Sequence, residues 1–198
     1  VIMPLRLAGV CPLANESVCE HHLICHPATP PFMADHIDVS VEVLDHGRLK
    51  VRYELHTDTE TLMLPLIDEP ARRDRLWQTT CFELFVCRPE GSPYLEYNFS
   101  PSTEWALYRF TGYREGMAEE MVDRPIITCD FSERHFGLNA NIVLPDRWQN
   151  SPLLLGLSAI VEESDGTKSY WALAHPPGKP DFHHRDCFAL QLEAPSAA

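Results

Sequence analysis

CFELFVCRPEGSPYLEYNFS, residues 81–100, consists of two runs of alternating side chains separated by a turn. An apolar residue at every second position predicts a β-strand in each run, and Pro89, Gly91 and Ser92 are typical turn residues. If the two runs form an antiparallel hairpin, burial of both apolar sets on one side fixes which residues face each other. This register pairs Phe82 with Phe99, Leu84 with Tyr97, and Val86 with Leu95.

The opposite face of this hairpin mixes apolar and polar side chains. The register places Glu83 opposite Asn98 and Phe85 opposite Glu96. A following strand brings Tyr108 beside Glu96. A flat apolar surface with a few polar groups is typical of a small-ligand site. The alternative is that the carboxylates simply face solvent, as strand carboxylates commonly do. We therefore take Glu83, Glu96, Asn98 and Tyr108 as candidate ligand-binding residues.

Short alternating runs recur along the rest of the chain, at residues 39–43, 49–55 and 136–144. Residues 153–161 are apolar on both faces, as in a central strand, and only residues 114–121 look helical. Most of the 17 prolines and 9 glycines fall between the runs, which predicts an all-β fold, a jelly-roll-like antiparallel β-sandwich. The length suits a single domain, residues 1–198, with the sandwich core at about 36–193.

Composition and charge exclude several classes of partner. The formal net charge is −13 without any Lys/Arg-rich run, whereas nucleic acids and anionic membranes attract basic surfaces. No apolar run approaches the roughly 18 residues of a membrane span. Residues 1–10 lack the basic region and the long apolar stretch of a secretory signal. We therefore expect a small-molecule partner, neither nucleic acid nor membrane, and the oligomeric state stays open.

The seven cysteines contain no C-x-x-C pair, so a zinc ribbon or a redox motif has no support. Cys81 and Cys87 stand six residues apart in one expected strand, and roughly 20 Å is too far for a disulfide or a shared metal. Buried free thiols are the simpler interpretation, and they are typical of a reducing compartment. We therefore expect a cytoplasmic protein.

A second candidate group lies in and after the strand-like segment 169–175. Trp171 and His175 share one face of that segment, and the loop that follows gathers Asp181, His183 and Arg185. Loops at the end of a rigid sandwich commonly carry function. His175, Asp181 and His183 could ligate zinc or iron, but their spacing matches no established ligand motif. Hydrogen-bonded loop histidines are favoured, so we assign no metal ligand and expect no cofactor.

Evidence for catalysis is sparse. Gly156-Leu-Ser158-Ala-Ile160 lacks the second glycine of a G-x-S-x-G nucleophile motif, and no phosphate loop or dinucleotide fingerprint is present. The catalytic alternative is acid–base chemistry in which a strand carboxylate, Glu83 or Glu96, acts with a loop histidine, His175 or His183. We assign no catalytic residue and favour a binding protein.

Three stretches carry a family resemblance: LWQTTCFELFV (76–86), YLEYNFSPS (94–102) with WALY (105–108), and SYWAL (169–173) through FHHRDCF (182–188). They resemble the bacterial DOMON-like proteins, relatives of the family 9 carbohydrate-binding module, over about residues 39–192. The resemblance implies a jelly-roll-like sandwich that binds a ligand, either sugar or, in DOMON domains generally, haem or sugar. Paired tryptophans grip a terminal sugar in the carbohydrate-binding branch, which makes Trp77 and Trp171 the matching candidates.

The leading interpretation is a small-ligand-binding β-sandwich whose ligand is a sugar or a sugar-like metabolite. The candidate ligand-binding residues are Trp77, Glu83, Glu96, Asn98, Tyr108, Trp171, His175, Asp181, His183 and Arg185. The alternatives are the acid–base enzyme described above and a haem- or metal-binding DOMON-type domain.

Overall fold

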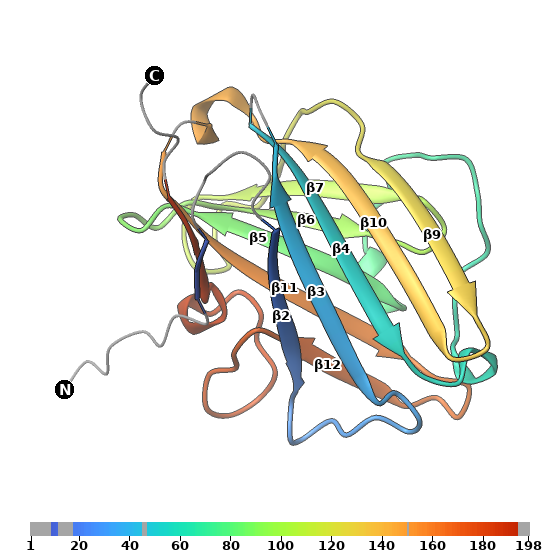
Figure 1. The fold of residues 1–198 in the computed structure, drawn as a ribbon. Coiled ribbons are helices and arrows are strands. Elements are labelled where there is room, and N and C mark those ends of the chain that lie inside the picture. The colour runs from blue at the N-terminus through green and yellow to red at the C-terminus, as the bar shows by residue number, and fades with distance from the viewer. Residues whose placement is uncertain (1–8, 12–17, 45–46, 150, 194–198) are drawn as a thin grey trace.

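The computed structural model describes residues 9–11, 18–44, 47–149 and 151–193, and these form a two-layered antiparallel β-sandwich (Figure 1). The layer that we call the first sheet contains, in spatial order, β8 (Ala118–Glu119), β7 (Trp105–Phe110), β6 (Tyr94–Phe99), β5 (Cys81–Cys87), β11 (Leu153–Glu162) and β12 (Lys168–Ala172). The second sheet contains β2 (Val18–Cys25), β3 (His36–Val43), β4 (Arg48–His56), β10 (His135–Val143) and β9 (Ile126–Ser132).

The remaining elements are short. At one edge of the first sheet, β13 (Leu190–Leu192) pairs with β11 and, in parallel orientation, with β1 (Gly9–Cys11). Among the described residues, four one-turn 3₁₀ helices lie between the strands: η1 (Thr59–Thr61), η2 (Leu76–Gln78), η3 (Asp146–Trp148) and η4 (Arg185–Cys187). In the part of the chain that the structure describes, no helix is long and apolar enough to cross a membrane.

The two sheets are continuous along one side of the sandwich. There β12 pairs with β2, Trp171 with Cys25 and Ala172 with Ile24, so both layers belong to one strongly curled sheet. Toward the other side, residues 71–73 lie beside β7, where the Trp105 amide donates to the carbonyl of Ala71 at 3.0 Å. This segment covers part of the edge of the first sheet.

The main core lies between the two sheets, where the alternating apolar side chains of both layers meet. Tyr53 and Phe82 are fully buried with ring centroids 5.1 Å apart, and Phe136 stacks on Phe82 at 5.8 Å. The Tyr53 hydroxyl donates to the Glu83 carbonyl at 2.6 Å, which satisfies a polar group that would otherwise be orphaned in the core.

The hairpin register expected from residues 81–100 is confirmed. Phe82 faces Phe99, Leu84 faces Tyr97 and Val86 faces Leu95 in the core, and on the other face Glu83 lies opposite Asn98 and Phe85 opposite Glu96. Tyr108 lies beside Glu96, as the meander predicts. Residues 153–161 form a central strand that is buried on both faces. The alternating runs at 39–43 and 49–55 are also strands, β3 and β4, and pair antiparallel; residues 45–46 between them lie outside the described residues.

The prediction of a helix at residues 114–121 is wrong. Arg114 and Gly116 have φ values of 56° and 62°, in the left-handed region that a right-handed helix cannot contain. The segment is a turn followed by β8, which pairs with β7. The Cβ of any side chain at position 116 would meet Thr111 Oγ1, a second reason for glycine there.

The prediction of free thiols holds for most of the cysteines. Cys25, Cys81, Cys87, Cys129 and Cys187 are free. It is wrong for Cys19, which is disulfide-bonded. Cys19 belongs to β2, a strand that the alternation pattern did not reveal and that lies before the expected core boundary at residue 36.

Candidate functional site

The outer face of the first sheet carries a second, smaller apolar cluster that includes Phe85, Tyr94 and Phe110. Residues 180–188 and η2 cover it, so β5 and β6 are buried on both faces. A cavity of about 340 Å³ opens in this cover. Its lining consists of Trp77, Glu83, Glu96, Phe110, Arg114, Met117, Ile160, Tyr170, Pro180, Phe182 and His183.

The floor of this cavity, which we call the carboxyl pocket, is a buried carboxyl pair. Glu83 and Glu96 come from adjacent strands and are 3% and 4% exposed. The Ser158 hydroxyl donates to Glu83 Oε2 at 3.1 Å, and Asn98 Nδ2 donates to Glu96 Oε1 at 2.8 Å. The Cys81 thiol donates in turn to the side-chain oxygen of Asn98, Oδ1, at 3.5 Å. Asn98 therefore fixes the orientation of Glu96 from beneath.

Burial controls the protonation of both carboxyls. It raises the pKa of Glu83 well above its usual range, repulsion from Glu96 adds to the rise, and Ser158 and Arg114 oppose it. Burial also raises the pKa of Glu96 to about 7, against the hydrogen bond from Asn98 and the charge of Arg114. The pair therefore keeps at least one proton at neutral pH and offers both a donor and an acceptor to a ligand.

His183 forms one polar side of the carboxyl pocket. Its Nε2 lies 3.7 Å from Glu96 Oε2, and its Nδ1 lies 2.7 Å from the Tyr94 hydroxyl. Burial first, and then Arg114, lower the pKa of His183 to about 4, so the ring is neutral at pH 7. Because the Arg114 amide donates to the Tyr94 oxygen at 3.2 Å, the Tyr94 proton is free to reach Nδ1.

Arg114 is the cation of the pocket, and no motif in the sequence pointed to it. Its guanidinium donates to Asp181 Oδ1 at 2.7 Å, and the Tyr113 hydroxyl also donates to Asp181. Burial alone would raise the pKa of Asp181, but these two hydrogen bonds outweigh it and hold the pKa below its ordinary value. Asp181 thus ties the turn at Arg114 to the loop that carries His183, and it is not itself among the lining residues.

The aromatic walls differ from the expected pair. Trp77, in η2, lines the pocket and lies edge-on to Tyr108 at 6.0 Å. Trp171 does not line it: this residue is 4% exposed in the core between the sheets, and its Nε1 donates to Ser169 Oγ at 2.8 Å. The expectation that Trp171 joins Trp77 is wrong, because the alternation of β12 turns the neighbouring Tyr170 to the outer face.

Three other candidates have supporting positions outside the lining of the carboxyl pocket. Tyr108 is buried, and its hydroxyl donates to Asp74 Oδ1 at 2.6 Å. His175 Nε2 donates to the carbonyl of Ile24 at 2.7 Å. Ile24 lies at the seam between the sheets, the place where β12 pairs with β2. Arg185 donates to three carbonyls of the β5–β6 turn, including Gly91 at 3.0 Å.

Arg185 also lines a second cavity, of about 390 Å³, beside the first. His183 and its partner Tyr94 belong to this lining, and His183 lines the carboxyl pocket as well. The two cavities are therefore neighbours with one imidazole between them.

The stability of the fold should fall as the pH rises from 6.5 to about 8.5. The pKa of Glu96 is about 7 in the fold against 4.5 ordinarily, so the folded state holds the extra proton between those values and loses that advantage as pH rises through 7. His183 acts in the opposite sense, but below its ordinary pKa of 6.5. Urea denaturation across this pH range should show that the free energy of unfolding of Glu96→Gln depends less on pH than that of the wild type. Equal slopes for the two proteins would contradict the raised pKa.

Comparison with known proteins shows the fold. The chain is similar to a putative carbohydrate-binding protein from Bacteroides uniformis, with a TM-score of 0.67 and 10% identity over 89% of this chain and 87% of that one. It is also similar to a family 9 carbohydrate-binding module from Caldicellulosiruptor kristjanssonii in complex with cellotriose, with a TM-score of 0.50 and 12% identity over 90% and 84% of the two chains. No protein-family model and no curated protein matches the sequence.

Proposed function

We propose that the carboxyl pocket binds a small carbohydrate. The observation that carries this proposal is the combination, in one cavity, of the aromatic side chains Trp77 and Tyr170 with the buried carboxyls Glu83 and Glu96. The C–H faces of a sugar ring pack on aromatic rings, while carboxyls and a neutral imidazole such as His183 hydrogen-bond to its hydroxyls. The role is binding, and the ligand leaves unchanged.

The size of the cavity limits the ligand. About 340 Å³ is near the lower end of the roughly 300–1,000 Å³ of small-molecule pockets, which suits a monosaccharide or the terminal ring of an oligosaccharide. The cellotriose complex of the similar family 9 module gives support from a protein of the same fold. We also propose that the chain is a DOMON-like protein, on the three sequence stretches described above.

Titration calorimetry against a panel of mono- and disaccharides tests the proposal. We expect saturable binding of at least one sugar with a dissociation constant of about 1 mM or tighter. The sugar recovered afterwards should be chemically unchanged. A well-folded protein that binds no member of the panel at about millimolar concentration would overturn the proposal.

One observation favours an enzyme as the second candidate. Glu96, with a pKa of about 7, lies 3.7 Å from the neutral His183, and a group that titrates near the working pH suits general acid–base catalysis. Of the two histidines that the sequence offered for this role, the pocket contains His183 and not His175. Chromogenic glycosides would report turnover. Activity that Glu96→Gln abolishes while the fold is kept would favour the enzyme over the binding protein.

A further inference from the structure

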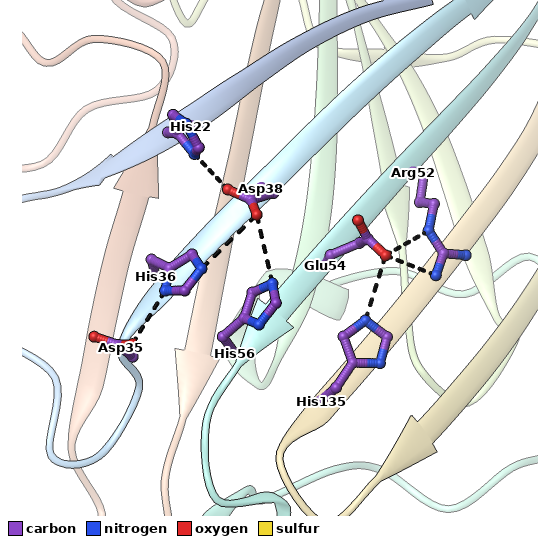
Figure 2. A network of polar contacts seen from close by, with 8 residues as sticks. All are labelled: His22, Asp35, His36, Asp38, Arg52, Glu54, His56 and His135. Atoms are coloured by element: carbon purple, nitrogen blue, oxygen red, sulfur yellow. Dashed lines mark hydrogen bonds and ion pairs between the residues drawn. The ribbon is translucent and has the colours of Figure 1, made fainter.

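The outer face of the second sheet carries a cluster of histidines and carboxylates that sugar binding does not use. Three cross-strand partners, His36, His56 and His135, form one row on β3, β4 and β10. Asp38 lies two residues after His36 on β3, in the next row, with His22 opposite it on β2. Figure 2 shows the Asp38 carboxylate between His22, His36 and His56. Regular strands hold all of these side chains, so their spacing is set by the sheet.

Three atoms of this cluster have the spacing of metal ligands. Asp38 Oδ2 lies 3.4 Å from His56 Nε2 and 3.8 Å from His36 Nε2, and all three atoms lie within 4.8 Å of one another. Ligands at about 2.0–2.1 Å from a tetrahedral Zn²⁺ are about 3.3 Å apart. The rings of His36 and His56 are nearly parallel, with centroids 4.1 Å apart, so both imidazoles must rotate out of this stack before their lone pairs can meet at one ion.

Contacts outside the three atoms orient two of the ligands. Asp35 Oδ2 accepts a hydrogen bond from His36 Nδ1 at 3.1 Å, which leaves the lone pair of His36 on Nε2. His22 Nδ1 bonds to the other oxygen of Asp38, Oδ1, and leaves Oδ2 facing the two imidazoles. A carboxylate behind a ligating histidine is a recurrent feature of metal sites, because it fixes the tautomer and the ring.

Solvent reaches the cluster. The side chains of His36, Asp38 and His56 are 46%, 33% and 37% exposed, so an ion can enter and keep a water ligand. The nearby Glu54 is held by Arg52 at 2.8 Å and does not compete for the ion. The loop histidines behave differently: among the residues that the structure describes, His175, Asp181 and His183 do not form such a group.

We propose that His36, Asp38 and His56 bind a divalent transition-metal ion, with Zn²⁺ as the ion that the donors suit best. Two imidazole nitrogens and one carboxylate oxygen suit zinc and not the hard ions Mg²⁺ and Ca²⁺, which require oxygen ligands. Three protein ligands leave the fourth position of the ion open to water or to a ligand group. The ion would also cross-link β3 to β4 near the ends of both strands.

Calorimetric titration with ZnCl₂ tests the site, on protein whose affinity tag has been removed and which has been treated with chelator and dialysed. We expect one equivalent of Zn²⁺ to bind, and Mg²⁺ not to bind. His36→Gln and His56→Gln should each weaken Zn²⁺ binding by at least about tenfold. Asp35→Asn should also weaken it, but by less than either of these two variants. Zinc should raise the thermal unfolding temperature of the wild type much more than that of His36→Gln or His56→Gln, since a ligand stabilises the state that binds it.

His184→Gln is the matched control, because His184 is half-exposed and lies on the other sheet's loop, where its Nδ1 accepts the amide of Asp186. This variant should bind zinc like the wild type. Absence of saturable binding to the wild type would overturn the proposal, as would full affinity in both His36→Gln and His56→Gln. If His184→Gln loses as much zinc affinity as His36→Gln and His56→Gln, the zinc binds to scattered surface histidines, and this result would also overturn the proposal. Circular dichroism of each variant separates loss of the site from loss of the fold, and sugar binding is measured separately.

Discussion

Trp77→Ala is expected to reduce sugar affinity by about thirtyfold or more, the largest effect of any single change in the carboxyl pocket. A tryptophan at the centre of a binding site typically contributes about 2 kcal/mol or more, and 1.4 kcal/mol corresponds to a factor of ten. Trp77 is partly buried and lies against Tyr108, so the side chain is held in place before the ligand arrives. Calorimetry with the best sugar of the panel measures the loss.

Two further variants make this result specific. Tyr170→Ala should also weaken binding, because Tyr170 lines the same cavity. Trp171→Phe should lower the free energy of unfolding and leave affinity almost unchanged, since Trp171 is in the core between the sheets. The reverse pattern, with Trp171 controlling affinity and Tyr170 without effect, would contradict the assignment of the aromatic walls.

Glu163→Ala is expected to lower the free energy of unfolding by at least about 3 kcal/mol. Glu163 is fully buried, and its carboxylate accepts the backbone amides of Phe32 at 2.6 Å, Met33 at 2.6 Å and Ala34 at 3.0 Å. Hydrogen bonds to a charged group contribute about 1.5–3 kcal/mol each. The variant removes all three bonds and leaves a void, and urea denaturation at constant pH measures the cost.

The adjacent Glu162 provides the control. Its side chain pairs with Lys168 at 3.5 Å near the surface, and surface ion pairs contribute at most about 1 kcal/mol. Glu162→Ala should therefore have a small effect beside that of Glu163→Ala. If the two substitutions cost the same, Glu163 does not hold residues 32–34 in the way that the hydrogen bonds indicate.

The register of the central hairpin could be predicted because its two faces differ in composition. Phe82, Leu84 and Val86 can be buried together only if Glu83 and Phe85 face the other way. β12 offered no such information, since its partner β11 is apolar on both faces. Trp171 was therefore taken from the resemblance to paired tryptophans alone, and the strand pattern could not show that its neighbour Tyr170 faces the pocket.

The loop residues show a second limit of prediction from sequence. The sequence grouped His175, Asp181, His183 and Arg185, but only His183 lines the carboxyl pocket, because the others form hydrogen bonds that hold the loop and its surroundings. Arg114 lines the pocket through a left-handed turn and a contact with Asp181, far away in the chain. Local patterns do not reveal contacts of that kind.

The seam between the sheets also has a consequence for folding kinetics. β2 is near the start of the chain and β12 near its end, yet they pair through Cys25 with Trp171 and Ile24 with Ala172. Closing so long a loop costs chain entropy before the stabilising contacts have formed. Folds with many distant pairings therefore fold slowly, in about milliseconds to seconds. We expect the seam to form late, so Tyr170 on β12 would take its place in the pocket wall at the end of folding.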